Sequence, residues 1–191
     1  MPYSREHKAK TRKAILNSAR KLFSTKGFNA VTVNEVMDDC ALTRGGFYAH
    51  FHSKAELYRE ALTFSAKNSE LAKLKPESIS SKTWLGKLLD AYLSIDHVNG
   101  KNPCPLAFLS TDIASRDDAT KETYTITYKN MNAILLEYAG TDSLCSKDTL
   151  FALTSMLIGA VAIARTLDDP HLVQAILISC RQQAGLMLGG I

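Results

Sequence analysis

The chain has 191 residues, of which 46% are apolar and 22% charged, values typical of an ordinary globular protein with one or two domains. Five prolines and ten glycines are too few for a fibrous or disordered chain. The net charge of +4 is uneven, because residues 1–58 hold ten Lys and Arg against five acidic residues, whereas residues 59–191 hold thirteen against fourteen. A basic N-terminal third favours a nucleic-acid partner, since phosphate contacts release counterions. The alternative from charge alone is a solvated basic terminus.

The chain shows no signal for secretion or membrane insertion, and we expect a cytoplasmic protein without membrane contact. Its start is basic and then amphipathic, and the most apolar later run, roughly residues 150–164, is shorter than a membrane span. The cysteines at positions 40, 104, 145 and 180 form no C-x-x-C pair and have no histidine at metal-ligand spacing. We therefore predict no zinc site, no disulfide framework and no cofactor.

The first predicted helix covers residues 8–25. Its apolar residues recur at helical spacing and mark one core face. Gly27 can adopt the left-handed conformation that ends a helix, and we expect Phe28 to pack back against it. Lysine and arginine residues crowd the helix start, where they oppose the helix dipole, an arrangement that suits nearby phosphates. The core face consists of Ile15, Leu16, Ala19, Leu22 and Phe23.

Two short helices joined by a tight turn follow. Thr32 and Glu35 have the spacing of a capping box, in which the threonine hydroxyl and the glutamate carboxylate each accept a hydrogen bond from a backbone amide. Residues 40–42 are small and apolar and predict the turn. Thr43 can then cap the second helix.

The second short helix has two contrasting sides. Phe47 and Phe51 lie four residues apart and are predicted to be buried, whereas Arg44, Tyr48 and His50 turn towards solvent. A short helix with an apolar back and an outward Arg, Tyr and His suits the major groove of DNA.

The run T-R-G-G-F-Y-A-H-F-H-S-K-A-E-L, from Thr43 to Leu57, resembles the recognition-helix signature of the tetracycline-repressor (TetR) family of one-component bacterial regulators. The chain departs from the family pattern at Ala55, where glutamate is common. The resemblance covers roughly the first third of the chain. It implies an N-terminal three-helix DNA-binding domain followed by a C-terminal helical domain for effector binding and dimerisation.

These residues also provide the predicted DNA contacts. Arg44 is placed to contact guanine O6 and N7, and the alternative for it is a phosphate contact. Gly45 and Gly46 would let the helix approach base edges closely. Short hydroxyl groups and outward polar side chains suit phosphates. The full predicted set is Thr32, Thr43, Arg44, Gly45, Gly46, Tyr48, His50 and Lys54.

The rest of the chain continues in helices, and no strand-like alternation or internal repeat occurs, so we predict an all-α fold. A fourth helix begins after Ser53, with Glu56 as a second capping box, and runs towards Leu74. Residues 76–81, with one proline and three serines, predict a loop and a candidate domain junction. Further helices are predicted at 83–98, 104–115, 117–139, 147–167 and 171–188. We assign residues 1–58 to a helix-turn-helix DNA-binding domain and 59–191 to a helical effector-binding and dimerisation domain.

The last two predicted helices are apolar on nearly all sides, which indicates burial on several faces. In the TetR family the corresponding pair forms a dimeric four-helix bundle, and the resemblance implies a homodimer. An internal core pair is the alternative. The interface candidates are Gly159, Ala160, Ile163, Leu177 and Met187.

Cys104 precedes Pro105, which can be the first residue of a helix. A thiol at a helix N-cap has a lowered pKa, and an accessible thiolate reacts with oxidants and electrophiles. We therefore consider Cys104 as a redox sensor, with Cys145 as a second exposed thiol. The alternative is a small apolar cap that never reacts.

Aromatic residues on the later helices could line a pocket for a small apolar ligand, although such residues are more often core. These candidates are Trp84, Tyr92, Phe108, Tyr124 and Tyr128.

The function that these observations favour is that of a dimeric regulator, a repressor by family resemblance, which binds a near-palindromic double-stranded operator. A small molecule, electrophile or oxidant would release it. The alternative is an architectural DNA-binding protein without an effector. An enzyme is not expected, because no catalytic motif accompanies Cys104. The sequence identifies neither the effector nor the operator.

Overall fold

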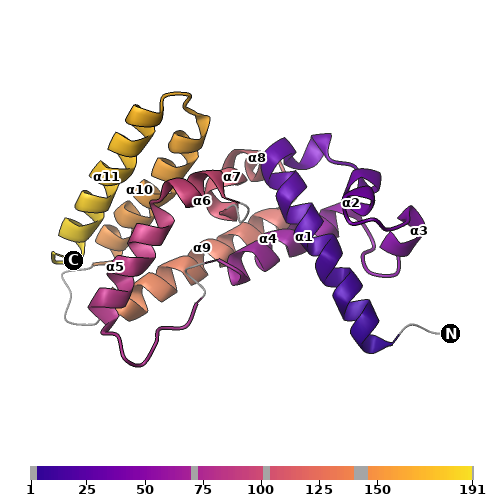
Figure 1. Ribbon diagram of the computed structural model, residues 1–191, viewed down its shortest axis with the longest axis horizontal. Helices are drawn as coiled ribbons and strands as arrows, with labels where there is room; N and C mark the ends of the chain where they lie inside the picture. Colours follow the sequence, from indigo (N-terminus) through magenta and orange to yellow (C-terminus); the bar gives the residue numbers. More distant parts are fainter. Residues whose placement is uncertain (1–3, 70–72, 101–103, 140–145, 191) are drawn as a thin grey trace.

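The computed structural model describes residues 4–69, 73–100, 104–139 and 146–190, and these residues form eleven helices and no strand. The all-α prediction is confirmed. In Figure 1 helices α1, α2 and α3 lie towards one end of the molecule, and α5, α10 and α11 lie at the other. Helices α4 and α9 pack against each other between the two ends.

The helix bounds are as follows. The N-terminal head, as we call helices α1 to α4, consists of α1 (Arg5–Ala30), α2 (Val33–Asp39), α3 (Arg44–Phe47) and α4 (Lys54–Lys67). It is followed by α5 (Ser81–Tyr92), α6 (Ile95–Asn99), α7 (Pro105–Phe108), α8 (Ser110–Ala114), α9 (Asp118–Ala139), α10 (Lys147–Thr166) and α11 (Pro170–Met187).

The head is built around buried aromatic rings. Phe23, Phe47, Phe51 and Tyr58 are each at most 1% exposed. Phe28 packs on the rings of Phe23 and Tyr58, with centroid distances of 6.1 and 5.2 Å. The predicted packing of Phe28 is therefore confirmed.

Gly27 makes this packing possible. Its φ of +74° interrupts the regular helical geometry of α1 before Ala30. A side chain is strained in this left-handed conformation, whereas glycine adopts it freely. The change of direction at Gly27 is what turns Phe28 back towards the core.

The capping prediction for α2 is confirmed. Thr32 accepts from the amide of Glu35, and the Glu35 carboxylate accepts from the amide of Thr32. These bonds, with that from Lys26, lower the pKa of Glu35 to about 2. At α4 Ser53 caps as expected, but Glu56 accepts from the amide of His52 rather than from that of Ser53.

Three predicted helices differ from those in the structure. Helix α4 ends at Lys67, and Leu74 lies beyond it, 88% exposed. The predicted helix at 83–98 is two helices, because Ser94 caps a new one with an extended backbone. The predicted helix at 104–115 is also two, separated at Leu109, whose side chain is buried in the core of the head. Side-chain packing between elements causes these breaks, and periodicity along the sequence does not reveal it.

The head core extends past its own helices. Ala61 and Leu62 of α4 belong to it, although they follow the predicted boundary at residue 58, and Leu109 and Ile113 of the α7–α8 segment also belong to it. The second core, formed by α5 to α7 and α9 to α11, is a separate cluster. The division into domains 1–58 and 59–191 stays a prediction. Helix α4 crosses this boundary, and its residues on both sides of the boundary pack into the head core.

Within the described residues α10 is the helix whose length and hydropathy would allow a membrane span. Core helices of soluble proteins have the same properties, and α10 packs against α11, α9, α7 and α6. Leu153, Leu157 and Val161 of α10 are at most 1% exposed within the second core.

Candidate functional site

Helices α2 and α3 are joined by a turn that is closed by backbone hydrogen bonds. The amide of Leu42 donates to the carbonyl of Met37 at 2.8 Å, and the amide of Ala41 donates to that of Asp38 at 3.0 Å. Ala41 has a φ of +54°, which a residue with a side chain adopts uncommonly. The turn therefore sets a defined angle between the two helices.

Helix α3 is short, and its back is fully buried. It comprises four residues, after which the amides of His50 and Phe51 both donate to the carbonyl of Phe47. The predicted burial of Phe47 and Phe51 is confirmed, since both are 0% exposed. The two rings anchor the outward face of α3 to the head core.

The outward face presents Thr43, Arg44, Gly45 and Tyr48, all of which are exposed. Tyr48 is 58% exposed. The side chain of Thr43 makes no cap hydrogen bond, contrary to the expectation that it caps α3. Thr32 is also exposed, but its hydroxyl is engaged with Glu35.

The two glycines of α3 face different ways. A Cβ at Gly45 would meet nothing within 4 Å, whereas a Cβ at Gly46 would lie 3.7 Å from Cε of Met37. Gly45 is thus consistent with close approach of a ligand. A Cβ at Gly46 would instead face α2, so the structure gives no support to the same prediction for Gly46.

His50 is less exposed than predicted. It is half-buried, and its Nδ1 is buried without a partner in the structure. Burial lowers the pKa of His50, and the positive charges of Lys8 and Arg12 lower it further. A neutral, half-buried ring is poorly suited to the solvent-facing phosphate contact that we predicted.

Lys54 has an internal role. Its ammonium donates to the carbonyls of Phe28 and Val31, each at 2.9 Å, and lies 4.2 Å from the centroid of the Phe28 ring. These contacts hold the connection between α1 and α2 against α4. A phosphate contact of Lys54, as predicted, would compete with these hydrogen bonds. The sequence did not reveal the two carbonyl acceptors, because they lie more than twenty residues away.

A cavity of about 810 Å³ lies in the C-terminal region, between the end of α4, helices α5 to α7 and α9. Apolar side chains such as Leu106, Met131 and Ile134 line it together with polar groups of Thr127 and Asn130. This volume is within the range of small-molecule sites.

Only some of the predicted pocket residues line this cavity. Tyr92 and Cys104 line it, but Trp84, Phe108, Tyr124 and Tyr128 are not among its lining residues. The hydroxyl of Tyr124 donates to the carbonyl of Leu106, and that of Tyr128 bonds to Thr154. Phe108, Tyr124 and Tyr128 pack against the second core, so the structure gives no support to an effector contact from them, and their role stays a prediction.

Sequence reasoning missed the part of the cavity wall that α9 provides. Residues of this wall recur at intervals of three and four, which is the spacing of one helical face. That periodicity was visible in the sequence, but their mixed polarity hid it. The missed residues are Thr127, Asn130, Met131, Ala133, Ile134 and Glu137.

The local structure at Cys104 agrees with the sequence, but the predicted chemistry does not. Cys104 is the N-cap of α7, with Pro105 as the first helical residue. The thiol is 8% exposed and lies 3.2 Å from the hydroxyl of Tyr92. Burial raises the pKa of Cys104, and this outweighs the opposing effects of Tyr92 and of the α7 amides. The prediction of an accessible, low-pKa thiolate is therefore wrong. Cys145 lies outside the described residues.

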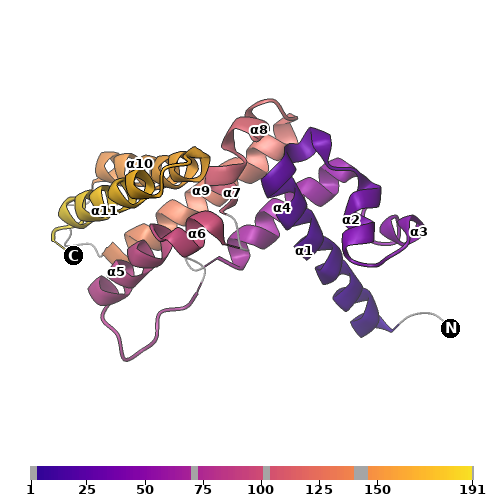
Figure 2. The ribbon, with the colours of Figure 1, turned by 45° about the horizontal axis from the view of Figure 1, so that its top comes forward.

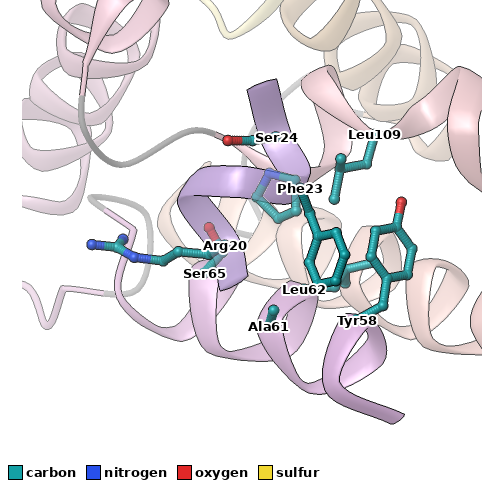
Figure 3. A pocket seen from close by; sticks show the side chains of 9 residues that line it. Arg20, Phe23, Ser24, Tyr58, Ala61, Leu62, Ser65 and Leu109 are labelled. Carbon is teal, nitrogen blue, oxygen red and sulfur yellow. The ribbon is translucent and has the colours of Figure 1, made fainter. Parts of the chain in front are cut away.

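A second, much smaller cavity of about 10 Å³ lies between α1 and α4 (Figure 3). Figure 3 shows the rings of Phe23 and Tyr58 next to each other near Leu109, and the two rings meet edge to face at a centroid distance of 4.9 Å. The space suffices for at most one water molecule. Pro105 lines both cavities, so α7 separates the large cavity from the contact between α1 and α4.

The predicted interface residues divide into two groups. Ile163 is 52% exposed, and a Cβ at Gly159 would meet nothing within 4 Å, so both face outwards. Ala160 and Leu177 are each 4% exposed within the second core, and Met187 packs against it. Ala160 and Leu177 thus face the core of their own subunit, contrary to the prediction, because helices that are apolar on all sides do not reveal from sequence which side meets the core. Met187 is half-buried, and its assignment stays a prediction.

In the described part of the chain, no group of three or more His, Cys, Asp and Glu side chains is placed to hold a metal ion.

The chain is similar to known regulators in two ways. Residues 15–61 match the family model described as "Bacterial regulatory proteins, tetR family". The chain is 31% identical over 87 residues to the HTH-type transcriptional regulator UidR of Escherichia coli (strain K12), covering 46% of this chain and 43% of UidR. It is 31% identical over 81 residues to the uncharacterized HTH-type transcriptional regulator YfiR of Bacillus subtilis (strain 168), covering 42% of this chain and 39% of YfiR.

The match thus spans about two fifths of the length of these relatives. The fold is similar over a longer stretch. A TetR-family transcriptional regulator from Cytophaga hutchinsonii superposes with a TM-score of 0.75 and 18% identity, covering 97% of both chains. At this identity the similarity shows the fold.

Proposed function

Because residues 15–61 match the family model of the TetR bacterial regulatory proteins, we propose that the chain is a dimeric one-component repressor of this family. It would bind a near-palindromic operator and leave it when a small molecule occupies the large cavity. The division of labour follows the two ends of the molecule, with DNA at the head and the ligand and the second subunit at the C-terminal helices.

The exposed face of α3 carries this proposal. Thr43, Arg44 and Tyr48 project from a four-residue helix whose back is held by two fully buried phenylalanines. Arg44 supplies donors for base edges or phosphates, and the exposed lysines at the start of α1 add positive charge. In a two-fold dimer two such faces would meet half-sites about one helical turn apart or somewhat more.

The outward faces of α10 and α11 support the dimer. The two helices lie side by side (Figure 2), and together they expose large apolar side chains at helical spacing. Large apolar side chains exposed on two neighbouring helices favour an interaction site. On α10 these side chains are Phe151 and Ile163, and on α11 they are Leu172, Ile178 and Leu186, between 46% and 68% exposed.

The cavity supports a non-covalent effector. Its apolar lining with a few polar groups suits a small, mainly apolar molecule. Since α7 contacts α1 and α4 as well as the cavity, an occupant that displaces α7 would alter the position of the head. Coupling between such sites is typically about 1–3 kcal/mol.

The test of DNA binding is selection of duplexes from a random library, followed by measurement of affinity at near-physiological salt. We expect the selected sequence to contain two inverted half-sites. Arg44→Ala should reduce the preference for this sequence over scrambled DNA, by about 1–3 kcal/mol if a guanine is read. The matched control is Lys10→Ala, at an exposed basic residue of α1, which should weaken both duplexes alike. Binding without any preferred sequence would instead favour an architectural protein.

The test of the dimer uses two isoleucines of equal exposure. Ile163 on α10 is 52% exposed and Ile126 on α9 is 51% exposed. We expect Ile163→Glu to give a monomer by sedimentation at micromolar concentration, because the charge would be buried in the interface, and Ile126→Glu to leave the dimer intact. A dimer that persists in Ile163→Glu would exclude the α10 face from the interface.

A further inference from the structure

The end of α1 is held by side chains that come from the C-terminal helices. Phe28 donates its amide to the carboxylate of Asp112 in α8, at 3.3 Å. Arg116 donates to the side chain of Asn29 at 2.9 Å. Arg165, near the end of α10, donates to the carbonyl of Ser24 at 3.3 Å. Thus α1 is tied to two different parts of the C-terminal region.

The two attachments come from helices that differ in their relation to the large cavity. Asp112 and Arg116 follow α7, whose residues Pro105 and Leu106 line the large cavity. Arg165 belongs to α10, none of whose residues is among those that line this cavity. Helix α10 also exposes Ile163, two residues earlier, on its outward face. Arg165 therefore connects the head directly to the helix of the proposed dimer, and Phe108, at the end of α7, lies beneath its guanidinium.

The surroundings of Arg165 are those of a positioned side chain. Its guanidinium lies over the ring of Phe108, 4.0 Å from the centroid, and is half-buried. Partial burial lowers the pKa of Arg165. Ser24 lies in the last turn before the break at Gly27, where helix carbonyls carry partial negative charge and attract cations. Arginine suits this place because its planar guanidinium stacks on a ring while it donates hydrogen bonds in the same plane.

We propose that Arg165 is a positioning residue for DNA reading, which fixes the head on the dimer-forming helix and so sets the separation of the two α3 faces. The inference rests on the proposed function, since it requires two heads on one dimer. Arg165 does not contact DNA in this scheme. It acts through Ser24 and the end of α1.

The consequence concerns the second half-site. Once one head is bound, the other binds intramolecularly, with an effective concentration that depends on how rigidly the dimer holds it. Loosening the heads lowers this effective concentration at the best spacing and raises it at other spacings. The affinity of one head for a single half-site does not depend on this effective concentration.

The experiment compares Arg165→Met with the wild-type protein on duplexes made from the selected operator. One duplex has a single half-site, one has both at the selected spacing, and a series has the spacing changed by one to four base pairs. Methionine keeps an apolar side chain over Phe108 but removes the donors. Arg181→Met is the matched control, because Arg181 pairs with Asp90 within the C-terminal region, at 2.5 Å. Phe108→Leu removes the ring under the guanidinium and provides a second variant.

We expect Arg165→Met to bind the two-site duplex about tenfold more weakly, to bind the single half-site with unchanged affinity, and to discriminate less among spacings. Phe108→Leu should shift the same profile in the same direction, and Arg181→Met should match the wild type. An unchanged spacing profile in Arg165→Met would overturn the proposal. Equal losses on one and two half-sites would overturn it too, because the head itself would then be damaged. A wild-type protein indifferent to the second half-site would instead remove the proposed function.

Discussion

The two ends of the molecule solve different packing problems. In the head, Phe23, Phe47 and Phe51 are almost fully buried, and the cavity against α1 and α4 measures about 10 Å³. The C-terminal region has its own core, yet it encloses about 810 Å³ and exposes apolar side chains on α10 and α11. A closed core holds a surface in one shape, whereas an open one leaves room for a ligand and a partner. The head thus offers only its outer surface for contacts, whereas the C-terminal region offers both an interior cavity and the outer faces of α10 and α11.

The largest effect that we predict tests this contrast in packing. Phe47→Ala should lower the free energy of unfolding by about 3–5 kcal/mol, because it leaves a void in a closed core. Ile134→Ala, in the wall of the large cavity, should cost only about 1 kcal/mol, because its side chain already borders empty space. Urea denaturation of both variants measures these values. Equal costs would show that the C-terminal region is packed as tightly as the head.

The next effect concerns the thiol in the cavity wall. In a variant that keeps Cys104 and replaces the other three cysteines by serine, we expect the reaction with Ellman's reagent at pH 8 to be more than about tenfold slower than that of a cysteine peptide. The physical reason is that burial raises the pKa of Cys104 and limits access to it. Stopped-flow absorbance measures the reaction rate, and unfolding in urea should raise the rate to that of the cysteine peptide. A native rate equal to the peptide rate would mean that the cavity wall opens freely.

The smallest effect is a pH dependence in the head. The pKa of Glu35 is lowered from 4.5 to about 2, chiefly by the hydrogen bond from the Thr32 amide. Because the folded pKa lies below the unfolded one, the carboxylate stabilises the fold fully above about pH 4.5, and this contribution is lost as the pH falls towards about 2. The difference in unfolding free energy between the wild type and Glu35→Gln should therefore be constant near neutral pH and shrink over this window. The side chain is 39% exposed and its charge is screened by solvent, so the change will be small.

A control for this pH effect is Thr32→Ala, which removes the hydroxyl partner of Glu35 but retains the carboxylate. In this background Glu35→Gln should produce a weaker pH dependence. An identical pH dependence in both backgrounds would assign the lowered pKa to the amide of Thr32 and to Lys26 alone.

Much of the head could be predicted because its signals are local. The capping box of Thr32 and Glu35 operates within one helical turn, the break at Gly27 depends on one residue, and Phe47 and Phe51 share a face by spacing alone. The side chains of the candidate DNA site were harder to place. Spacing along the sequence predicts that Lys54 and His50 face outwards, but the groups that surround them come from α1 and from Val31 just after it, which lie far away in the sequence.

Less of the C-terminal region could be predicted. The end of α4, the division of the 83–98 stretch and the division of the 104–115 stretch all depend on packing between helices. The aromatic residues at 108, 124 and 128 pack against the second core, whereas one wall of the cavity consists of less conspicuous residues of α9. A residue type that favours burial does not specify whether it borders a neighbour or an empty space.

The sequence by itself determined the all-α fold, the helix-turn-helix and its buried aromatic back, because capping and helical periodicity act over a few residues. Tertiary structure alone decided the burial of Cys104, the orientation of α10 and α11, and the contact of Arg165 with Ser24. These depend on side chains that approach from distant elements. At Cys104 the cost of burying a charge exceeds the effect of the helix N-terminus, and only the assembled core sets that cost.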